Sequence, residues 1–143
     1  MENGANNNME YDIAVIGGGP GGYVAALYAG IHGARVVLIE KDRRLGGTCL
    51  LRGCIPSKTM VKTAEILEEM HRGEEFGISG HAEPNWAGIV ARKDRVVAGL
   101  VKGLDDLVKA RKITRLHGFG RLLTPRSVLV QGLDESNRGQ AIT

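Results

Sequence analysis

The chain has little cysteine, few aromatic residues and no long apolar run, and each shortage excludes a class of protein. Its two cysteines, Cys49 and Cys54, are too few for a secreted fold held together by disulfides. No apolar run approaches the roughly 20 residues that a membrane-spanning helix needs. Aromatic residues make up only 4% of the chain, and the net charge of +3 comes without a long basic run, which argues against nucleic-acid binding.

The amino terminus also lacks the features of a targeting segment. Residues 1–10 contain neither a basic stretch nor an apolar one and are rich in Asn, which predicts a disordered tail. With no targeting signal in view, we expect a cytoplasmic protein. Residues 11–143 are enough for one domain with a core and too few for two.

Glycine is abundant, with 21 residues in 143, and about half of them lie between positions 17 and 53. The first group lies in GGGPGG, which follows an apolar run at 11–16 and precedes an Ala-rich segment at 23–31. A second apolar run, 35–39, ends in Glu40. This order of strand, glycine turn, helix and strand is typical of a β-α-β unit.

The spacing Gly17-x-Gly19-x-x-Gly22, followed by an acid at position 40, is the fingerprint of a dinucleotide-binding turn. Gly17 would permit the tight turn, Gly19 would let the backbone approach a pyrophosphate, and Gly22 would let helix and strand pack closely. The phosphates would lie at the helix amino terminus, and Glu40 would accept hydrogen bonds from ribose hydroxyls. The alternative is a glycine-rich turn that binds nothing, and the placement of strand, helix and acid favours the dinucleotide.

The rest of the chain predicts two amphipathic helices and short strands. One helix covers about 57–70, with Ser57 as a plausible N-cap and an apolar face formed by Met60, Val61, Ala64, Leu67 and Met70. After a loop rich in Gly and Pro, Asn85 caps a longer helix that reaches about residue 110. Its expected apolar face consists of Trp86, Ile89, Val90, Val97, Leu100, Val101, Leu104, Leu107 and Val108. Short strands are expected at 113–116, 120–123 and 127–130, followed by polar residues after 131.

The two cysteines leave two interpretations open. The four histidines, His32, His71, His81 and His117, show no ligand spacing, which argues against a metal site. In a regular helix the Cα atoms of Cys49 and Cys54 would lie about 8.6 Å apart, beyond the limit of about 7 Å for a disulfide. Gly53 and Pro56 could supply the distortion that a bridge needs. The pair is then either a short redox-active bridge or two reduced, inert thiols.

A flavin can accept hydride and also face sulfur, so it would link a dinucleotide turn to a dithiol. GGGPGGY, the acid at position 40 and above all GGTCLLRGCIPSK resemble the FAD-binding segment of the class I pyridine nucleotide-disulfide oxidoreductases. Within that family, the ending Ile-Pro-Ser-Lys at 55–58 is most similar to dihydrolipoyl dehydrogenases. Many members have Asn at the position of Leu51, and some have Val at the position of Arg52.

The resemblance implies a role for each matching residue. Cys54 would be the thiol that faces the flavin, and Cys49 would exchange with the substrate. Lys58 would approach the flavin ring, and the backbone of Gly120 would lie near the adenine. The implied cofactor-binding residues are Gly17, Gly19, Pro20, Gly22, Glu40, Lys41, Gly47, Thr48, Cys49, Lys58 and Gly120.

The resemblance also implies a fold and a function. The fold is α/β: a Rossmann-like FAD-binding domain with a parallel sheet of at least three strands and a small antiparallel hairpin, incomplete at its carboxyl end. An open sheet edge and marginal stability are therefore expected. The implied reaction moves electrons from dihydrolipoamide, carried on an acyltransferase complex, through the Cys pair and FAD to NAD in a homodimer. The NAD site would lie after position 143, so these residues alone are expected to be inactive.

Two alternatives remain at this point. One is a mercuric- or glutathione-type disulfide reductase, in which the electrons run the other way. The other is a non-catalytic nucleotide-binding module whose cysteines act as a thiol sensor.

Overall fold

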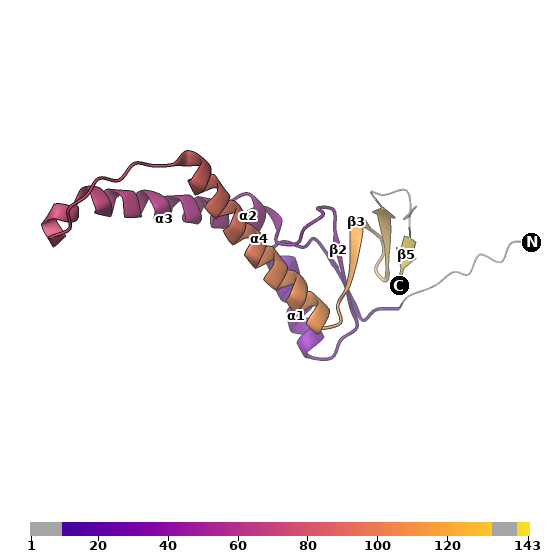
Figure 1. Cartoon of the computed structure of the whole chain (residues 1–143). Coiled ribbons are helices and arrows are strands. Elements are labelled where there is room, and N and C mark those ends of the chain that lie inside the picture. Colours follow the sequence, from indigo (N-terminus) through magenta and orange to yellow (C-terminus); the bar gives the residue numbers. More distant parts are fainter. Residues whose placement is uncertain (1–9, 133–139) are drawn as a thin grey trace, which may run out of the picture.

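The computed structural model describes residues 10–132 and 140–143, so the tail predicted for residues 1–10 lies outside it except for Glu10. Five strands and four α-helices, together with one short 3-10 helix, make up the described part (Figure 1). In chain order they are β1 Ile13–Ile16, α1 Pro20–Ile31, β2 Val36–Glu40, α2 Gly47–Leu51, α3 Cys54–His71, η1 Gly73–Phe76, α4 Trp86–Ala110, β3 Thr114–Thr124, β4 Ser127–Gly132 and β5 Gln140–Ile142.

The strands form one sheet in the order β1-β2-β3-β4-β5. The pairs β1–β2 and β2–β3 are parallel, with Ile13 opposite Val36 and Ile39 opposite Leu116. This parallel half confirms the predicted Rossmann-like arrangement. The β3–β4 pair is antiparallel and confirms the small antiparallel unit predicted near 120–130, and β4–β5 is a second antiparallel pair.

Two details of the predicted strands were wrong. The strands expected at 113–116 and 120–123 are a single strand, β3, whose first part pairs with β2 and whose second part pairs with β4. One long strand can serve both pairings because its successive segments use different neighbours. The polar end of the chain also contributes a strand, β5, whose Ile142 is buried.

Strand β2 lies between β1 and β3 in the parallel part of the sheet, and all five of its residues are buried. Val36 and Leu38 pack with α1 and α4, while Val37 and Ile39 pack with β4 and β5. Helices therefore cover one face of the parallel strands and the antiparallel strands cover the other (Figure 1). Burial on both faces explains why β2 reads as an uninterrupted apolar run.

Helix α4 begins where the sequence predicts, because the Asn85 side chain accepts a hydrogen bond from the Gly88 N–H at 3.1 Å. Only part of the expected apolar face is covered. The buried positions of this helix are Val97, Val101, Leu104 and Val108. Leu100 and Leu107, which were predicted on the same face, are exposed, and so is Trp86. The buried stripe of α4 that packs against the sheet core is therefore narrower than the apolar face that the sequence predicts.

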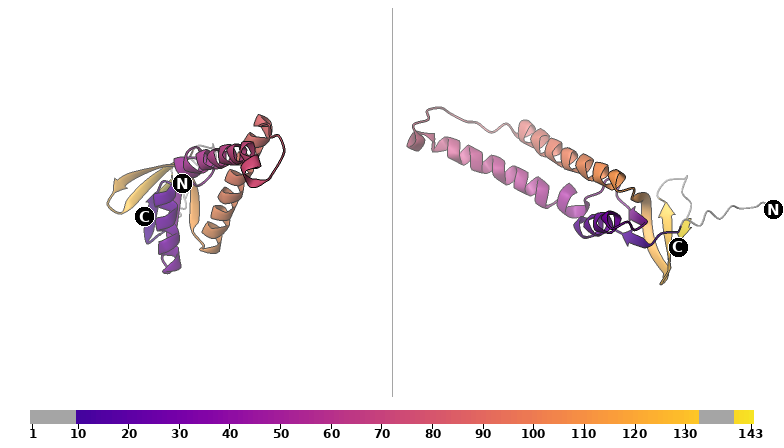
Figure 2. Two further views of the ribbon diagram at one scale, coloured as in Figure 1. Left: turned by 90° about the vertical axis from the view of Figure 1, so that its left-hand side faces the viewer. Right: turned by 90° about the horizontal axis from the view of Figure 1, so that it is seen from below.

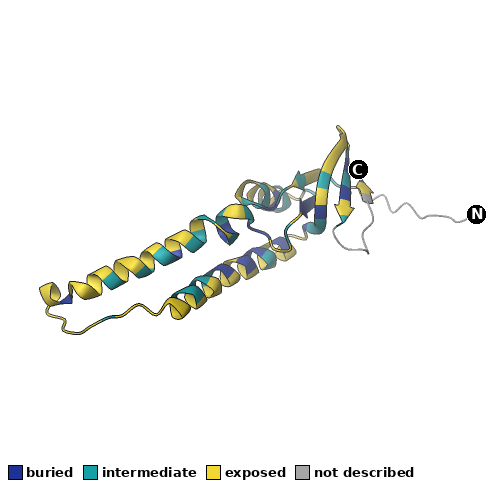
Figure 3. Ribbon diagram, turned by 90° about the horizontal axis from the view of Figure 1, so that it is seen from above, coloured by how far each residue is buried: buried dark blue, intermediate teal, exposed yellow. Residues whose placement is uncertain are grey.

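Helix α3 begins three residues earlier than predicted, at Cys54, and its N-cap is Gly53. Ser57 is not the cap, since its N–H already donates to the Gly53 carbonyl within the first turn. Helices α3 and α4 run side by side away from the sheet (Figure 2). Most of the outer part of α3 is exposed (Figure 3), so its predicted apolar face forms but is largely uncovered by the described chain.

Strand β1 forms an edge of the described sheet, as expected, and its Ile13 and Ile16 are exposed. Among the described residues, none of the helices combines the length and the apolar character that crossing a membrane requires.

Candidate functional site

The glycine turn joins the end of β1 to the start of α1. Gly17 has φ +101°, which favours glycine, and its N–H donates to the Ile39 carbonyl at 2.8 Å. Gly19 is the extended N-cap of α1, and Pro20 is the first helical residue. An ideal Cβ atom on Gly22 would lie 1.7 Å from the Gly17 carbonyl oxygen. The turn can therefore take this shape only with glycine at position 22, as the spacing predicts.

The amino end of α1 has open space where a pyrophosphate would lie. Nothing lies within 4 Å of the place where a side chain on Gly21 would begin, and only the Gly47 Cα approaches the corresponding place on Gly19. The backbone at the amino end of α1 is therefore not covered by side chains of the turn itself. Unpaired N–H groups and the helix dipole favour an anion at such a position.

Glu40 ends β2 and is only 6% exposed. Its Oε2 accepts a hydrogen bond from the Gly18 N–H, and its Oε1 accepts one from the Asp42 N–H at 2.7 Å. Two backbone donors thus fix the carboxylate beside the glycine turn. Each carboxylate oxygen can accept more than one hydrogen bond, so the arrangement leaves acceptor capacity for a ribose hydroxyl.

The loop after β2 brings the cysteine segment against the glycine turn. The Gly46 N–H donates to the Gly18 carbonyl at 2.8 Å, and an ideal Cβ on Gly47 would lie 2.7 Å from the Gly19 Cα. Gly46 and Gly47 both have positive φ, +119° and +59°. Leu45, which is fully buried, lies directly beneath Gly18. Two loops about 28 residues apart in sequence therefore touch through glycine backbone.

The two cysteines flank a break between helices. Cys49 lies in α2, and Cys54 is the first residue of α3. Between them Gly53 has φ −121° and ψ −106°, so the chain leaves helical geometry as a bridge would require. Pro56 lies within the first turn of α3, where a missing N–H costs nothing.

Both cysteines are free thiols in the structure, with Cys54 exposed and Cys49 half-buried. Their side chains are within hydrogen-bonding reach of each other. That hydrogen bond is the main reason why the pKa of the Cys49 thiol lies above its ordinary value, and burial adds to the rise. The charge of Lys58, which follows Cys54 by four residues in α3 and so lies on the same face of the helix, acts in the opposite direction.

The remaining predicted site residues occupy the borders of this region. An ideal Cβ on Gly120 would lie 3.0 Å from Ile16, the last residue before the glycine turn, so β3 passes close to the turn at this glycine. Thr48 is in α2, and its carbonyl accepts a hydrogen bond from the Arg52 N–H. Lys41 Nζ lies 5.7 Å from the centre of the ring of Phe119, the neighbour of Gly120 in β3.

The resemblance implies that the stretch 41–48 lines the cofactor, but it gives no individual role to Asp42, Leu45 or Gly46, which build this region. The Gly46-Gly47 pair carries a local signal, since adjacent glycines indicate a turn that needs positive φ. Leu45 and Asp42 carry none, because their roles depend on which loops the fold brings together.

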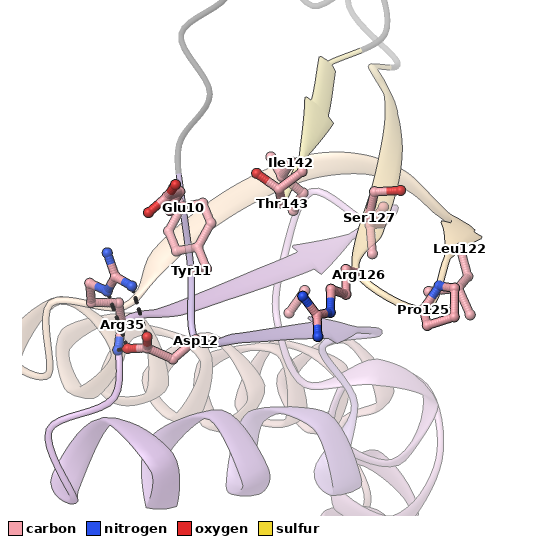
Figure 4. Close-up of a pocket in the computed structure, with 12 residues that line it drawn as sticks. Glu10, Tyr11, Asp12, Arg35, Leu122, Pro125, Arg126, Ser127, Ile142 and Thr143 are labelled. Carbon is pink, nitrogen blue, oxygen red and sulfur yellow. Dashed lines mark hydrogen bonds and ion pairs between the residues drawn. The ribbon is translucent and has the colours of Figure 1, made fainter.

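A separate hollow of about 440 Å³ lies between the beginning of β1 and the β3–β4 hairpin (Figure 4). Arg35 pairs with Asp12 there at 2.8 Å. Hydrogen bonds from the Arg35 side chain and backbone lower the pKa of the Asp12 carboxyl to about 2. None of the residues predicted to bind a cofactor lines this hollow.

Comparison with known proteins identifies the family of the chain. The sequence pattern of the family described as "Pyridine nucleotide-disulphide oxidoreductase" matches residues 11–133. The chain is 43% identical over 127 residues to a dihydrolipoyl dehydrogenase of Acholeplasma laidlawii, covering 87% of this chain and 38% of that protein. It is 44% identical over 132 residues to a dihydrolipoyl dehydrogenase of Chlamydia trachomatis, covering 90% of this chain and 28% of that protein.

A leghemoglobin reductase of Vigna unguiculata is 42% identical over 135 residues, covering 93% of this chain and 26% of that protein. The chain thus spans between about a quarter and two fifths of the length of these relatives. Because the family pattern covers most of the described residues, including the glycine turn and both cysteines, the chain belongs to the pyridine nucleotide-disulphide oxidoreductase family.

Proposed function

We propose that this chain is the FAD-binding and redox-dithiol part of a dihydrolipoyl dehydrogenase-like flavoenzyme. The observation that carries the proposal is the contact between the glycine turn and the cysteine segment, made by Gly46 with Gly18 and by Gly47 with Gly19. A turn suited to pyrophosphate and a segment bearing two thiols are thereby joined. When bound, FAD supplies a centre that takes two electrons from a dithiol and passes them to NAD as hydride.

In this proposal the turn from Gly17 to Gly22 holds the pyrophosphate, and Glu40 accepts hydrogen bonds from the adenosine ribose. Gly47 and Thr48 line the cofactor beside the turn. Lys41, Lys58 and Gly120 extend the site, and of these Lys58 has the best support because its charge acts on Cys49.

The thiol chemistry needs only the two cysteines and a dithiol substrate. One thiolate of dihydrolipoamide attacks Sγ of Cys49 in the Cys49–Cys54 disulfide, which breaks the bridge and releases Cys54 as the thiolate. The second substrate thiolate then attacks the substrate sulfur of the mixed disulfide and releases Cys49. Lipoamide leaves as a disulfide, and the two electrons it lost remain on the Cys49/Cys54 dithiol.

The partners are proposed from the relatives' names and the family. We propose dihydrolipoamide on an acyltransferase complex as the electron donor and NAD as the acceptor, with a homodimer as the working form and the cytoplasm as its compartment. Two of the relatives reported above bear the name dihydrolipoyl dehydrogenase, which favours this direction over a mercuric- or glutathione-type reductase.

Flavin binding and thiol chemistry can be tested together on the 143-residue chain. FAD is titrated into the purified chain while its fluorescence is followed, and the complex is then reduced anaerobically with a dithiol. We expect FAD to bind and a long-wavelength charge-transfer absorbance to appear on reduction. Cys54→Ser should still bind FAD and lack that absorbance.

The possible failures separate the alternatives. Binding of ADP without binding of FAD would overturn the proposal in favour of a nucleotide-binding module with a thiol sensor. A charge-transfer absorbance that survives in Cys54→Ser would overturn the role of Cys54.

A further inference from the structure

Arg52 lies at the joint between α2 and α3, three residues after Cys49 and two before Cys54. Its Nη2 donates to Asp42 Oδ2 at 2.8 Å, and the two side chains are 59% and 25% exposed. The Arg52 N–H also donates to the Thr48 carbonyl, so backbone and side chain both hold this residue. The ion pair thus joins the loop after β2 to the joint between the two thiols.

The Asp42 end of this pair is firmly placed. Its N–H donates to Glu40 Oε1 at 2.7 Å. On one side of it, a hydrogen bond of 3.0 Å joins the Lys41 carbonyl to His117 Nε2, and on the other the Arg115 side chain donates to the Arg43 carbonyl. Strands β2 and β3 therefore fix the loop that carries Asp42, and the ion pair holds the Arg52 side chain against this loop.

Apolar packing of Leu50, Leu51 and Ile55 against the core also holds the two helices at the joint, but side-chain hydrogen bonds there are few. In the described chain neither α2 nor α3 has a side-chain hydrogen bond at its N-cap, and the cap of α3 is Gly53, which has the freest backbone of all residues. A disulfide forms only when the two Cβ atoms lie about 3.5–4.5 Å apart. Any rotation at the joint changes that separation, because Cys49 lies on one side of it and Cys54 on the other.

We propose that the Asp42–Arg52 ion pair positions this joint and thereby favours closure of the Cys49–Cys54 disulfide. Arg52 and Asp42 are positioning residues that act through the backbone at Gly53. The inference rests on the proposed function, since it requires the two cysteines to be a redox couple. It gives Arg52, one of the two departures from the common family sequence, a defined role in this chain.

A purely electrostatic effect of Arg52 would behave differently. A cation near the thiols stabilises thiolates and so favours the open dithiol. Asp42→Asn would then free the Arg52 charge and oppose the disulfide, whereas Arg52→Gln would remove the charge and favour it. Positioning predicts that both substitutions oppose the disulfide, because either one releases the joint.

The test measures the equilibrium between dithiol and disulfide in the whole 143-residue chain without added cofactor. The chain is equilibrated in mixtures of reduced and oxidised glutathione, in which two electrons and two protons pass from the Cys49/Cys54 dithiol to glutathione disulfide. The fraction of closed bridge is read by acid quenching, alkylation and mass spectrometry. Circular dichroism shows that each variant has kept its fold.

We expect Asp42→Asn and Arg52→Gln each to lower the equilibrium constant for closure by about two- to fivefold, the range that a partly exposed ion pair can produce. The double variant should be no lower than the lower single variant, because both break the same contact. Arg52→Lys, which keeps a cation at the joint, should restore part of the loss. Asp12→Asn breaks the exposed pair with Arg35 at the other end of the parallel strands and should leave the constant unchanged.

If the wild-type bridge forms, three results would overturn the positioning role. These are opposite shifts in the two single variants, additive losses in the double variant, and an unchanged equilibrium constant in both single variants. Failure of the wild-type chain to form the Cys49–Cys54 bridge at all would overturn the proposed function as well, so the two failures are distinguishable.

Discussion

The carbonyl oxygen of Gly17 occupies the space into which a side chain on Gly22 would extend, with an ideal Cβ only 1.7 Å from that oxygen. We predict that Gly22→Ala lowers the free energy of unfolding by about 3 kcal/mol, the upper range for overpacking, because the turn and α1 must separate to admit the methyl group. Urea denaturation followed by circular dichroism measures the change.

Gly21 provides a matched control in the same turn of α1, since nothing lies within 4 Å of the position its Cβ would take. Gly21→Ala should raise the free energy of unfolding by about 0.5–1 kcal/mol, because alanine loses less backbone entropy in a helix. Equal effects of the two substitutions would show that the close approach of Gly17 and Gly22 is not present in solution.

A second prediction concerns the contact between the two loops. Gly47 has φ +59°, and an ideal Cβ there would lie 2.7 Å from the Gly19 Cα. Gly47→Ala should push the cysteine segment away from the glycine turn and weaken FAD binding at least tenfold, as measured by fluorescence titration. A tenfold loss corresponds to about 1.4 kcal/mol of binding free energy.

The control for this variant is Gly33→Ala. Gly33 also has positive φ, +86°, but nothing lies within 4 Å of its Cβ position. Both substitutions strain the backbone by of order 1 kcal/mol, so only the loss of FAD affinity should distinguish them. An unchanged FAD affinity in Gly47→Ala would contradict the proposed cofactor site at this contact.

The sequence predicts the β-α-β unit around Gly17 and Glu40 well, because glycine spacing, an apolar run and a terminal acid are all local signals. The cap at Asn85 is local too, and it was confirmed. The start of α3 was misplaced because Ser57 is a good N-cap by residue type, whereas the helix extends back to Gly53 through a joint that no cap signal marks.

What the sequence could not provide is contact between distant segments. The apolar residues of α4 suit a wide buried face, yet Leu100 and Leu107 stay exposed because the sheet core accepts only the stripe from Val97 to Val108. The burial of Leu45 beneath Gly18 likewise depends on where the loop after β2 lies. Tertiary packing decides these points, and periodicity alone does not.

A third prediction concerns Glu40, whose two carboxylate oxygens each accept a backbone N–H, from Gly18 and from Asp42. Glu40→Gln replaces one acceptor oxygen with an NH₂ group, so one N–H in a buried setting loses its partner. The free energy of unfolding should fall by about 1–3 kcal/mol, the cost of an unsatisfied buried polar group.

Asp105→Asn serves as the comparison for Glu40→Gln, because it also neutralises a carboxylate, but one that accepts its hydrogen bond from the Arg115 side chain, at 3.1 Å. Its loss should be about 1 kcal/mol or less, as for other partly exposed ion pairs. A smaller loss in Glu40→Gln than in Asp105→Asn would mean that the carboxylate of Glu40 does not hold the two backbone groups.

The last prediction concerns the pH dependence of Cys49. The hydrogen bond with Cys54 is the main cause of its raised pKa, and the charge of Lys58 lowers that pKa. Because the thiolate is the nucleophile, the rate of alkylation of Cys49 by iodoacetamide follows its deprotonation. In Cys54→Ala the rate profile should move to lower pH, so that Cys49 reacts faster near pH 8. At high pH, where Cys49 is a thiolate in both proteins, its rate in the variant should be somewhat lower, because a thiolate of lower pKa is a weaker nucleophile. In Lys58→Gln the profile should move to higher pH.

Peptide mapping by mass spectrometry gives the rates, and Ser57→Ala, an exposed change in the first turn of α3, should leave the profile in place. Shifts of the same sign in Cys54→Ala and Lys58→Gln would show that the two side chains do not act on Cys49 in opposite ways.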